Sequence, residues 1–147
     1  MRILVLNGPN LNLLGERERA LYGSTTLDGV EAMLSAQASR RSVELLFFQS
    51  NHEGALIDRL HQARGQVDGV VFNPGAYAHT SVALLDALLA VALPVVEVHV
   101  TNLDRREDFR RRSITAAGAL ARIDGFGADG YRLALDGLVN YLQLDKS

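Results

Sequence analysis

A short charged loop contains residues that could remove a proton from carbon. Arg17, Arg19 and Tyr22 lie between two glycines, Gly15 and Gly23, in a segment without apolar periodicity. A tyrosine base needs nearby cations, because a phenol is almost fully protonated at neutral pH unless guanidinium groups stabilise the phenolate. The segment therefore predicts a lid with glycine hinges that carries a tyrosine base. A solvated surface loop is the alternative.

Glu97 and His99 form a second set, which could deliver a proton. They are two positions apart in an apolar run, so in a strand their side chains share one face. A carboxylate beside a histidine favours the imidazolium form and orients the ring, which suits a general acid. A buried structural ion pair is the alternative. His52 and His61 show no metal-ligand spacing, so no metal site is predicted.

Polar residues that follow the apolar runs could bind a small polar ligand. Asn10 follows the first run, and a carboxamide can hold a water or a carbonyl oxygen, although a tight turn would also use asparagine here. Asn73 ends the third run. His79 lies just before an expected helix, where anions and hydrogen-bonded ligands bind. A capping or interface histidine is the alternative for His79.

Residues 105–112 are rich in arginine and could bind an anion. Arg106 and Arg110 are four positions apart, which would place them on one face of a short helix. Guanidinium groups suit carboxylate or phosphate ligands. A nucleic-acid surface is the rival interpretation, but Glu107, Asp108 and a net charge of -2 argue against it. We expect one or two of these arginines to contact a ligand.

The composition excludes several other chemistries. The chain has 147 residues, of which 48% are hydrophobic and 22% charged, as in a globular domain. The absence of cysteine excludes thiol chemistry, and the single lysine, Lys146 beside the C-terminal residue, argues against a Schiff base. No apolar stretch approaches about 20 residues, and residues 3–6 are too short for a signal-peptide core. A cytoplasmic protein without a membrane partner is expected.

Short apolar runs alternate with longer helix-like segments, and these elements must position the candidate residues. Strands are expected at residues 3–6, 43–48, 69–72, 94–98 and 119–123. Helices are expected near 26–39, from residues 50–53 to about 63, from residues 80–81 to about 91, and from 128 to about 142. The expected helix-start signals are Thr25 with Asp28, a capping box at residues 50–53, and Thr80 with Ser81. Nearly continuous apolar strands are typical of parallel sheets that are buried on both faces.

The sequence therefore predicts one α/β domain over residues 1–147, with a flavodoxin-like, doubly wound sheet of five parallel strands in the order 2-1-3-4-5. Ligands of such sheets bind outside the carboxyl ends of the strands. Asn10, Asn73, His79, Glu97 and His99 all end or follow expected strands. Fold and chemistry thus predict one site at that edge.

Four long motifs resemble those of the type II 3-dehydroquinate dehydratases, and the resemblance runs from residue 3 to about residue 138. The motifs are LNGPNLNLLG at 6–15, QSNHEG at 49–54, NPGAY at 73–77 with HTS at 79–81, and VEVH at 96–99; YG at 22–23 also matches. The resemblance implies reversible anti dehydration of 3-dehydroquinate to 3-dehydroshikimate through an enolate. This reaction would serve shikimate biosynthesis or quinate catabolism.

The resemblance also implies catalytic roles. Tyr22 is similar to the base that removes a proton from C2, and Arg17 is similar to the lid arginine that keeps this tyrosine as a phenolate. Asn10 is similar to the residue that holds a water against the enolate oxygen. His99, oriented by Glu97, is similar to the acid that protonates the departing C1 hydroxyl.

The other implied residues would bind the substrate. They are Asn73, His79, Asp86, Val100, Thr101 and Arg110, with Glu18 and Arg106 on the lid side. Val100 and Thr101 would bind the carboxylate, partly through backbone N–H groups, and Asp86 would reach the site of a neighbouring subunit. The resemblance implies no cofactor or metal, and a homo-oligomer of trimers within a dodecamer.

Some positions depart from the family pattern without removing a catalytic residue. Arg19 stands where proline is usual and Asp104 where histidine is usual, so lid closure or the pH optimum could differ. A non-catalytic paralogue that binds a small polyhydroxy carboxylate is therefore the alternative function. The complete set of base, acid and partner residues favours the enzyme, because binding alone requires neither a base nor an acid.

Overall fold

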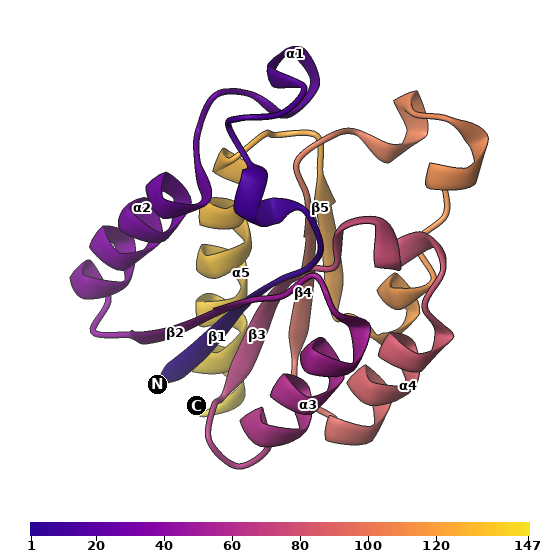
Figure 1. Cartoon of the computed structure of the whole chain (residues 1–147). Helices are drawn as coiled ribbons and strands as arrows, with labels where there is room; N and C mark the ends of the chain where they lie inside the picture. The colour runs from indigo at the N-terminus through magenta and orange to yellow at the C-terminus, as the bar shows by residue number, and fades with distance from the viewer.

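The computed structural model describes residues 1–147 and contains one five-stranded sheet (Figure 1). The strands are β1 (Arg2–Asn7), β2 (Glu44–Gln49), β3 (Gly69–Asn73), β4 (Val95–His99) and β5 (Ala121–Asp124). They lie in the order β2-β1-β3-β4-β5, and every neighbouring pair is parallel. The predicted flavodoxin-like fold and strand order are confirmed. β5 begins at Ala121 rather than at the expected Ala119.

Four helices cover the two faces of the sheet (Figure 1). They are α2 (Leu27–Arg40), α3 (Glu53–Ala63), α4 (Val82–Val91) and α5 (Asp129–Asp145). α2 and α5 pack on one face and α3 and α4 on the other, so the sheet separates two apolar cores. Ile3 and Val5 of β1 belong to the first core and Leu4 and Leu6 to the second, as the alternation of side chains along a strand requires.

The strands differ in how deeply they are buried. β1, β3 and β4 are buried almost throughout, whereas β2 is half-buried and β5 is exposed over its first two residues. The expectation that all five strands are buried on both faces is therefore wrong for β2 and β5. These are the edge strands, and the helices cover the centre of the sheet more completely than its edges.

Helix starts follow the expected chemistry only in part. The Ser81 hydroxyl caps α4, as predicted, by accepting a hydrogen bond from a first-turn N–H at 2.9 Å. Thr26 rather than Thr25 caps α2. The capping box at residues 50–53 is wrong, because the Ser50 hydroxyl accepts from the backbone N–H of His52 and α3 begins without a side-chain cap.

The connections that follow β1, β3 and β4 gather at the carboxyl edge of the sheet (Figure 1). At this edge they contain the short helix α1 (Arg19–Tyr22) and the 3-10 turns η1 (Leu11–Leu13), η2 (Gly75–His79), η3 (Leu103–Arg105) and η4 (Asp108–Arg110). A further 3-10 turn, η5 (Thr115–Gly118), packs beside α4 before β5 begins. The single helical face expected for Arg106 and Arg110 is wrong, because Arg106 is extended between η3 and η4 (φ -98°, ψ -177°). No helix combines the length and apolar character that a membrane crossing needs.

Candidate active site

A cavity of about 210 Å³ opens between the connections that follow β1, β3 and β4. The predicted residues on its wall are Asn10, Arg17, Glu18, Tyr22, Asn73, His79, His99, Val100, Thr101, Arg106 and Arg110. Of the predicted site residues, only Glu97 and Asp86 are not on this wall. The cavity lies at the carboxyl edge of the sheet, where the fold class leads us to expect a ligand.

The Tyr22 hydroxyl is bound by an arginine from a distant part of the chain. Arg106 Nη2 donates a hydrogen bond to it at 3.2 Å, and the Arg17 guanidinium stacks on the ring with Cζ 4.4 Å from the centroid. Two cations thus flank one phenol. Arg19, the other local candidate in the sequence, does not take part, because its Nε donates to the Gly15 carbonyl at 2.9 Å.

Arg106 is anchored on both sides of its guanidinium group. Its Nη1 donates to Thr101 Oγ1 at 2.9 Å, and its Nε lies 3.6 Å from Glu107 Oε2. The same oxygen of Glu107 lies 3.0 Å from Arg110 Nε. The two arginines that helical spacing suggested therefore do meet at the cavity, but they share a carboxylate rather than a helix face. The three side chains together keep one net positive charge.

Glu97 and His99 share one face of β4, as the spacing predicts, and both side chains are buried. His99 Nε2 lies 3.2 Å from Glu97 Oε2, a contact that becomes an ion pair when the imidazole is protonated. The Ser113 hydroxyl donates to Oε2 at 2.7 Å, and the Thr115 hydroxyl donates to Oε1. Burial alone would raise the pKa of Glu97, but His99 and the two hydroxyls outweigh burial and lower it below 4.5. An ionised carboxylate therefore stands behind His99 at neutral pH.

The His79 ring stacks beside His99, with centroids 6.2 Å apart. His79 Nδ1 lies 2.8 Å from the Arg112 carbonyl oxygen, and a carbonyl only accepts, so Nδ1 carries a proton. Burial lowers the pKa of His79; the Arg112 carbonyl partly offsets this, and His99 and Arg110 lower the pKa further. His79 is therefore neutral near pH 7, and its Nε2 is an acceptor for a ligand hydroxyl.

Two asparagines reach the cavity in different ways. Asn73 Nδ2 donates to the Tyr131 hydroxyl at 2.9 Å, and Asn73 Oδ1 accepts from the Gly75 N–H at 3.0 Å, so its amide orientation is set. Asn10 has φ 66°, a conformation that asparagine tolerates. Its backbone N–H donates to Asn51 Oδ1 at 2.9 Å. The side-chain amide of Asn10 makes no hydrogen bond within the chain and is available to a ligand or a water.

Val100 and Thr101 are buried directly after β4. Among the backbone hydrogen bonds outside helices and strands, none is donated by the N–H of either residue. Buried backbone N–H groups nearly always have a partner. Two unpaired donors on a cavity wall therefore fit an anionic ligand group such as a carboxylate.

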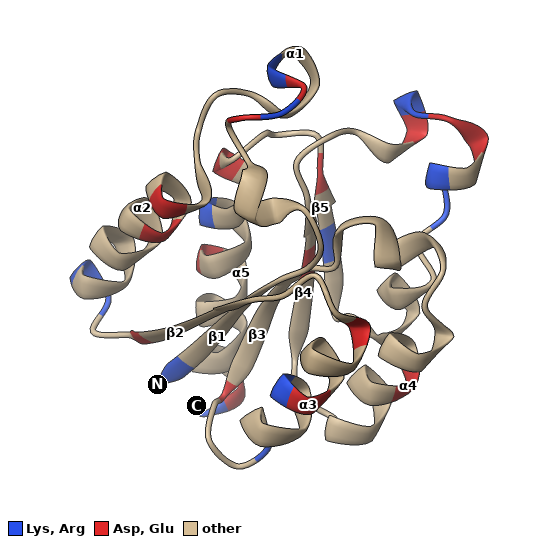
Figure 2. Cartoon of the chain, in the orientation of Figure 1, with Lys and Arg blue, Asp and Glu red and all other residues tan.

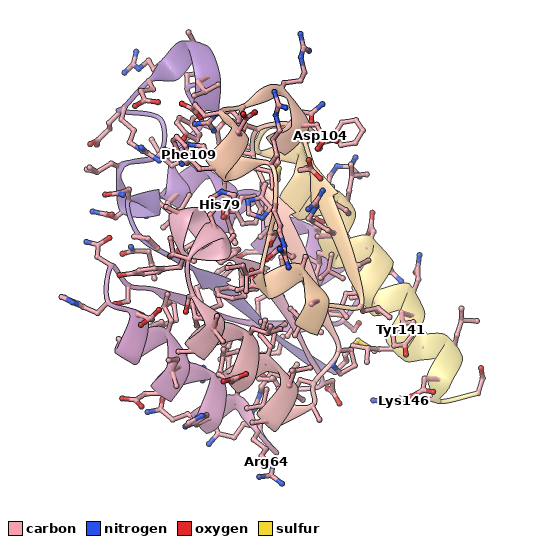
Figure 3. All side chains as sticks on the ribbon, turned by 90° about the vertical axis from the view of Figure 1, so that its right-hand side faces the viewer. Arg64, His79, Asp104, Phe109, Tyr141 and Lys146 are labelled. Atoms are coloured by element: carbon pink, nitrogen blue, oxygen red, sulfur yellow. The ribbon has the colours of Figure 1, made fainter.

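Several residues of interest lie away from the cavity. Asp86 is exposed on α4, and Asp104 is exposed on η3, so the departure from the family pattern at Asp104 lies on the surface. Lys146 lies at the far end of the molecule from His79 (Figure 3), with its Nζ 3.5 Å from Asp68 Oδ1. No group of three or more metal-ligating side chains is placed to hold a metal ion.

The sequence did not single out Ser113, Thr115 or Tyr131 as site residues. None of the three side chains lines the cavity; each forms a hydrogen bond with Glu97 or Asn73. None stands at a strand end or in a motif with an obvious chemistry. Nothing local in the sequence signals their contacts, because each contact spans at least 16 positions.

The fold and the cavity together define a class of protein: a flavodoxin-like α/β enzyme with a tyrosine flanked by arginines and a buried histidine–glutamate pair. The family model for dehydroquinase class II matches residues 1–139. The chain therefore belongs to the class II dehydroquinase family. It is a hydro-lyase that dehydrates 3-dehydroquinate, and the activity predicted from the motifs is confirmed.

Individual relatives agree with this assignment. The chain is 57% identical over 143 residues to the 3-dehydroquinate dehydratase of Synechococcus sp. (strain WH7803), covering 97% of each protein. It is 53% identical to the catabolic 3-dehydroquinase of Verticillium alfalfae, covering 97% of this chain and 95% of that protein. The crystal structure of type II dehydroquinase from Butyrivibrio crossotus DSM 2876 has a TM-score of 0.93 at 43% identity, with 95% and 97% coverage. Family membership is compatible with a biosynthetic or a catabolic pathway.

Proposed function

We propose that Tyr22, as a phenolate, removes a proton from C2 of 3-dehydroquinate. The observation that carries this role is the 3.2 Å hydrogen bond from Arg106 to the Tyr22 hydroxyl, with Arg17 on the ring face. Adjacent positive charge stabilises a phenolate. The electron pair of the broken C–H bond moves into an enolate on the C3 oxygen. The free side-chain amide of Asn10 holds a water that donates to this oxygen.

His99 then completes the elimination as the general acid. The enolate collapses to a C1–C2 double bond, the C1–O bond breaks, and His99 protonates the leaving hydroxyl as it departs as water. Glu97 stabilises the imidazolium and orients the ring. Base and acid act on opposite faces of the substrate, which makes the elimination anti. Loss of the Tyr22 proton to solvent and uptake of a proton by His99 reset the enzyme.

The remaining cavity residues hold the substrate. The backbone N–H groups of Val100 and Thr101 bind its carboxylate, because they are buried donors without a partner. Asn73, His79 and Arg110 contact its hydroxyl groups. Glu18 and Arg106 close the site from the lid side, where both contribute to the cavity wall.

The two rival functions receive less support. A binding protein would not need a phenol flanked by two cations opposite a buried histidine–carboxylate pair. A nucleic-acid surface would need free arginines, but Arg106 and Arg110 pair with Glu107, and Arg111 pairs with Asp108 at 3.0 Å. Figure 2 shows basic and acidic residues side by side along this connection.

We also propose a homo-oligomer of trimers within a dodecamer, in which Asp86 reaches the cavity of a neighbouring subunit. Asp86 is exposed on α4, and the same helix exposes Val82 and Leu89, each at 58%. Exposed apolar side chains on one helix suit a subunit contact. A sedimentation experiment that finds only a 16 kDa monomer would contradict this assembly. One catalytic domain over residues 1–147 and a cytoplasmic location stay predictions.

Tyr22→Phe tests the proposed base. The product is a conjugated enone, so turnover is followed by near-ultraviolet absorbance after addition of 3-dehydroquinate. We expect kcat to fall by about 10²–10⁴-fold while substrate affinity is kept, as for loss of a general base. Tyr141→Phe, a change at a residue of α5 that is 41% exposed and is not on the cavity wall, serves as the control. A variant that retains more than about a tenth of the wild-type kcat would exclude Tyr22 as the base.

A further inference from the structure

Two hydroxyl groups complete the hydrogen bonding of the buried Glu97 carboxylate. Ser113 Oγ donates to Oε2 at 2.7 Å, and Thr115 Oγ1 donates to Oε1. A hydroxyl has one proton and an ionised carboxylate only accepts, so both protons are directed to Glu97. The 3.2 Å contact between the two hydroxyl oxygens therefore carries no proton. This arrangement suits an ionised Glu97, because a carboxylate accepts from both hydroxyls at once, whereas a protonated carboxyl would have to use one of them as its own acceptor.

The segment that carries these hydroxyls, residues 112–115, is tied to η2. The backbone N–H of Ile114 donates to the Ala78 carbonyl at 2.7 Å, and the Arg112 carbonyl accepts from His79 Nδ1 at 2.8 Å. The backbone N–H of Ala116 also donates to Ser113 Oγ at 3.1 Å. The position of the segment is therefore set by several bonds that do not involve Glu97, and the hydroxyls are preorganised.

We propose that Ser113 and Thr115 are positioning residues for the acid half of the reaction, which keep the Glu97 carboxylate ionised and oriented behind His99. This inference rests on the proposed roles of Glu97 and His99. Neither hydroxyl residue lies on the cavity wall, so both act through Glu97 and not on the substrate. A buried carboxylate that loses its donors takes up a proton more readily, and a neutral Glu97 no longer supports an imidazolium.

None of the charged groups around Glu97 could replace the two hydroxyls in stabilising its carboxylate. His99 lies on the same strand, and His79 approaches from η2. Arg122 is in register with Glu97 on β5, but its Nε pairs with Asp124 at 3.2 Å, and Asp124 is in register with His99. No arginine or lysine forms an ion pair with Glu97. Its negative charge is therefore stabilised by one imidazole and two neutral hydroxyls.

Thr115→Val removes one hydroxyl with little change of shape. We expect kcat to fall about tenfold, with KM within about twofold, because a hydrogen bond to a charged group is lost. We expect the acid limb of the kcat–pH profile to move about one unit to higher pH, because Glu97 takes up a proton more readily. Thr115→Ser keeps the hydroxyl and should restore both properties. Thr80→Val, which removes an exposed hydroxyl, is the control.

Two further variants separate the possible outcomes. Ser113→Ala, at a less buried position, should show the same change in kcat and pH profile even where Thr115→Val folds poorly. In a Glu97→Gln background, Thr115→Val should lower kcat no further. A wild-type kcat and pH profile in both hydroxyl variants would overturn the inference. So would a further loss of about tenfold in kcat when Thr115→Val is added to Glu97→Gln. A Glu97→Gln variant with wild-type kcat would instead overturn the proposed role of Glu97.

Discussion

The Tyr131 hydroxyl lies 2.9 Å from Asn73 Nδ2 and accepts its hydrogen bond, although the two residues are 58 positions apart. The same hydroxyl donates to Asn7 Oδ1 at 2.6 Å. Burial raises the pKa of Tyr131 well above 10.0, so this side chain is a phenol and not a base. A helix on one face of the sheet thus sets the amide orientation of a cavity residue at the end of β3.

Tyr131→Phe should destabilise the fold by about 1–3 kcal/mol, because the buried amides of Asn7 and Asn73 each lose a partner. KM should also rise, since the amide of Asn73 is then held only by the Gly75 N–H. Urea unfolding and steady-state kinetics measure the two effects. Tyr141→Phe on the same helix, at 41% exposure, should change neither. Wild-type stability in the Tyr131 variant would mean that the amides find other partners.

Arg106→Gln should lower kcat at least about tenfold, because Tyr22 loses the guanidinium that contacts its hydroxyl. Arg106→Lys should recover part of the loss, since it keeps the charge but not the paired contacts with Tyr22 and Thr101. The matched control is Arg105→Gln, which alters an exposed neighbour. Equal kcat values for Arg105→Gln and Arg106→Gln would show that the hydrogen bond from Arg106 to Tyr22 does not contribute to catalysis.

Glu97 should make stability depend on pH in the acid range. Its pKa is lower in the folded chain than 4.5, the ordinary value. The folded state therefore binds fewer protons than the unfolded state over this range, so the stabilisation is complete above 4.5 and is lost as pH falls through the folded pKa. Glu97→Gln should reduce the difference between unfolding free energies measured at pH 6 and at about pH 3.5.

A surface carboxylate serves as the control for the acid dependence of the unfolding free energy. Glu44 forms an exposed ion pair with Arg2, and such pairs contribute little to stability. Glu44→Gln should therefore keep the acid-range slope of the wild type. A Glu97→Gln variant with that same slope would show that the buried carboxylate is not the source of the acid dependence.

Gly8→Ala and Gly137→Ala should have opposite effects on stability. A Cβ at Gly8 would lie 2.4 Å from the Pro74 carbonyl oxygen, so the connections after β1 and β3 would have to separate, at a cost of about 3 kcal/mol or more. A Cβ at Gly137 meets no atom within 4 Å, and alanine should stabilise α5 by about 0.5–1 kcal/mol. Chemical denaturation of both variants checks the signs, and a stable Gly8→Ala variant would contradict the close packing.

Local sequence patterns were sufficient for the fold and for the place of the site. The apolar runs and the helix-like segments between them predicted the parallel sheet, its order and the carboxyl edge that carries the cavity. They could do so because backbone hydrogen bonding and strand burial allow few alternatives for such a pattern. Helix caps were less predictable: Thr25 and Thr26 are chemically alike, and the backbone conformation decided which of them caps α2.

The candidate residues chosen from the sequence include the polar side chains of the cavity wall except Glu107, but the sequence did not show which of them contact one another. The sequence favoured Arg17 and Arg19 as partners of Tyr22, because they are close along the chain. In the structure, however, it is Arg106, 84 positions away, that donates a hydrogen bond to the Tyr22 hydroxyl. The extended backbone between η3 and η4 makes this contact possible, and no periodicity in residues 105–112 signals it.

The reactive side chains, and the edge of the sheet at which they meet, could thus be inferred from the amino-acid sequence. Their hydrogen-bond partners became visible only in the folded chain: Ser113 and Thr115 bind Glu97, and Tyr131 binds Asn73. The two kinds of information differ because the underlying interactions differ in range. Strand and helix formation depend on neighbours along the chain, whereas a hydrogen bond depends on ångström-scale placement of atoms that the folded chain alone brings together.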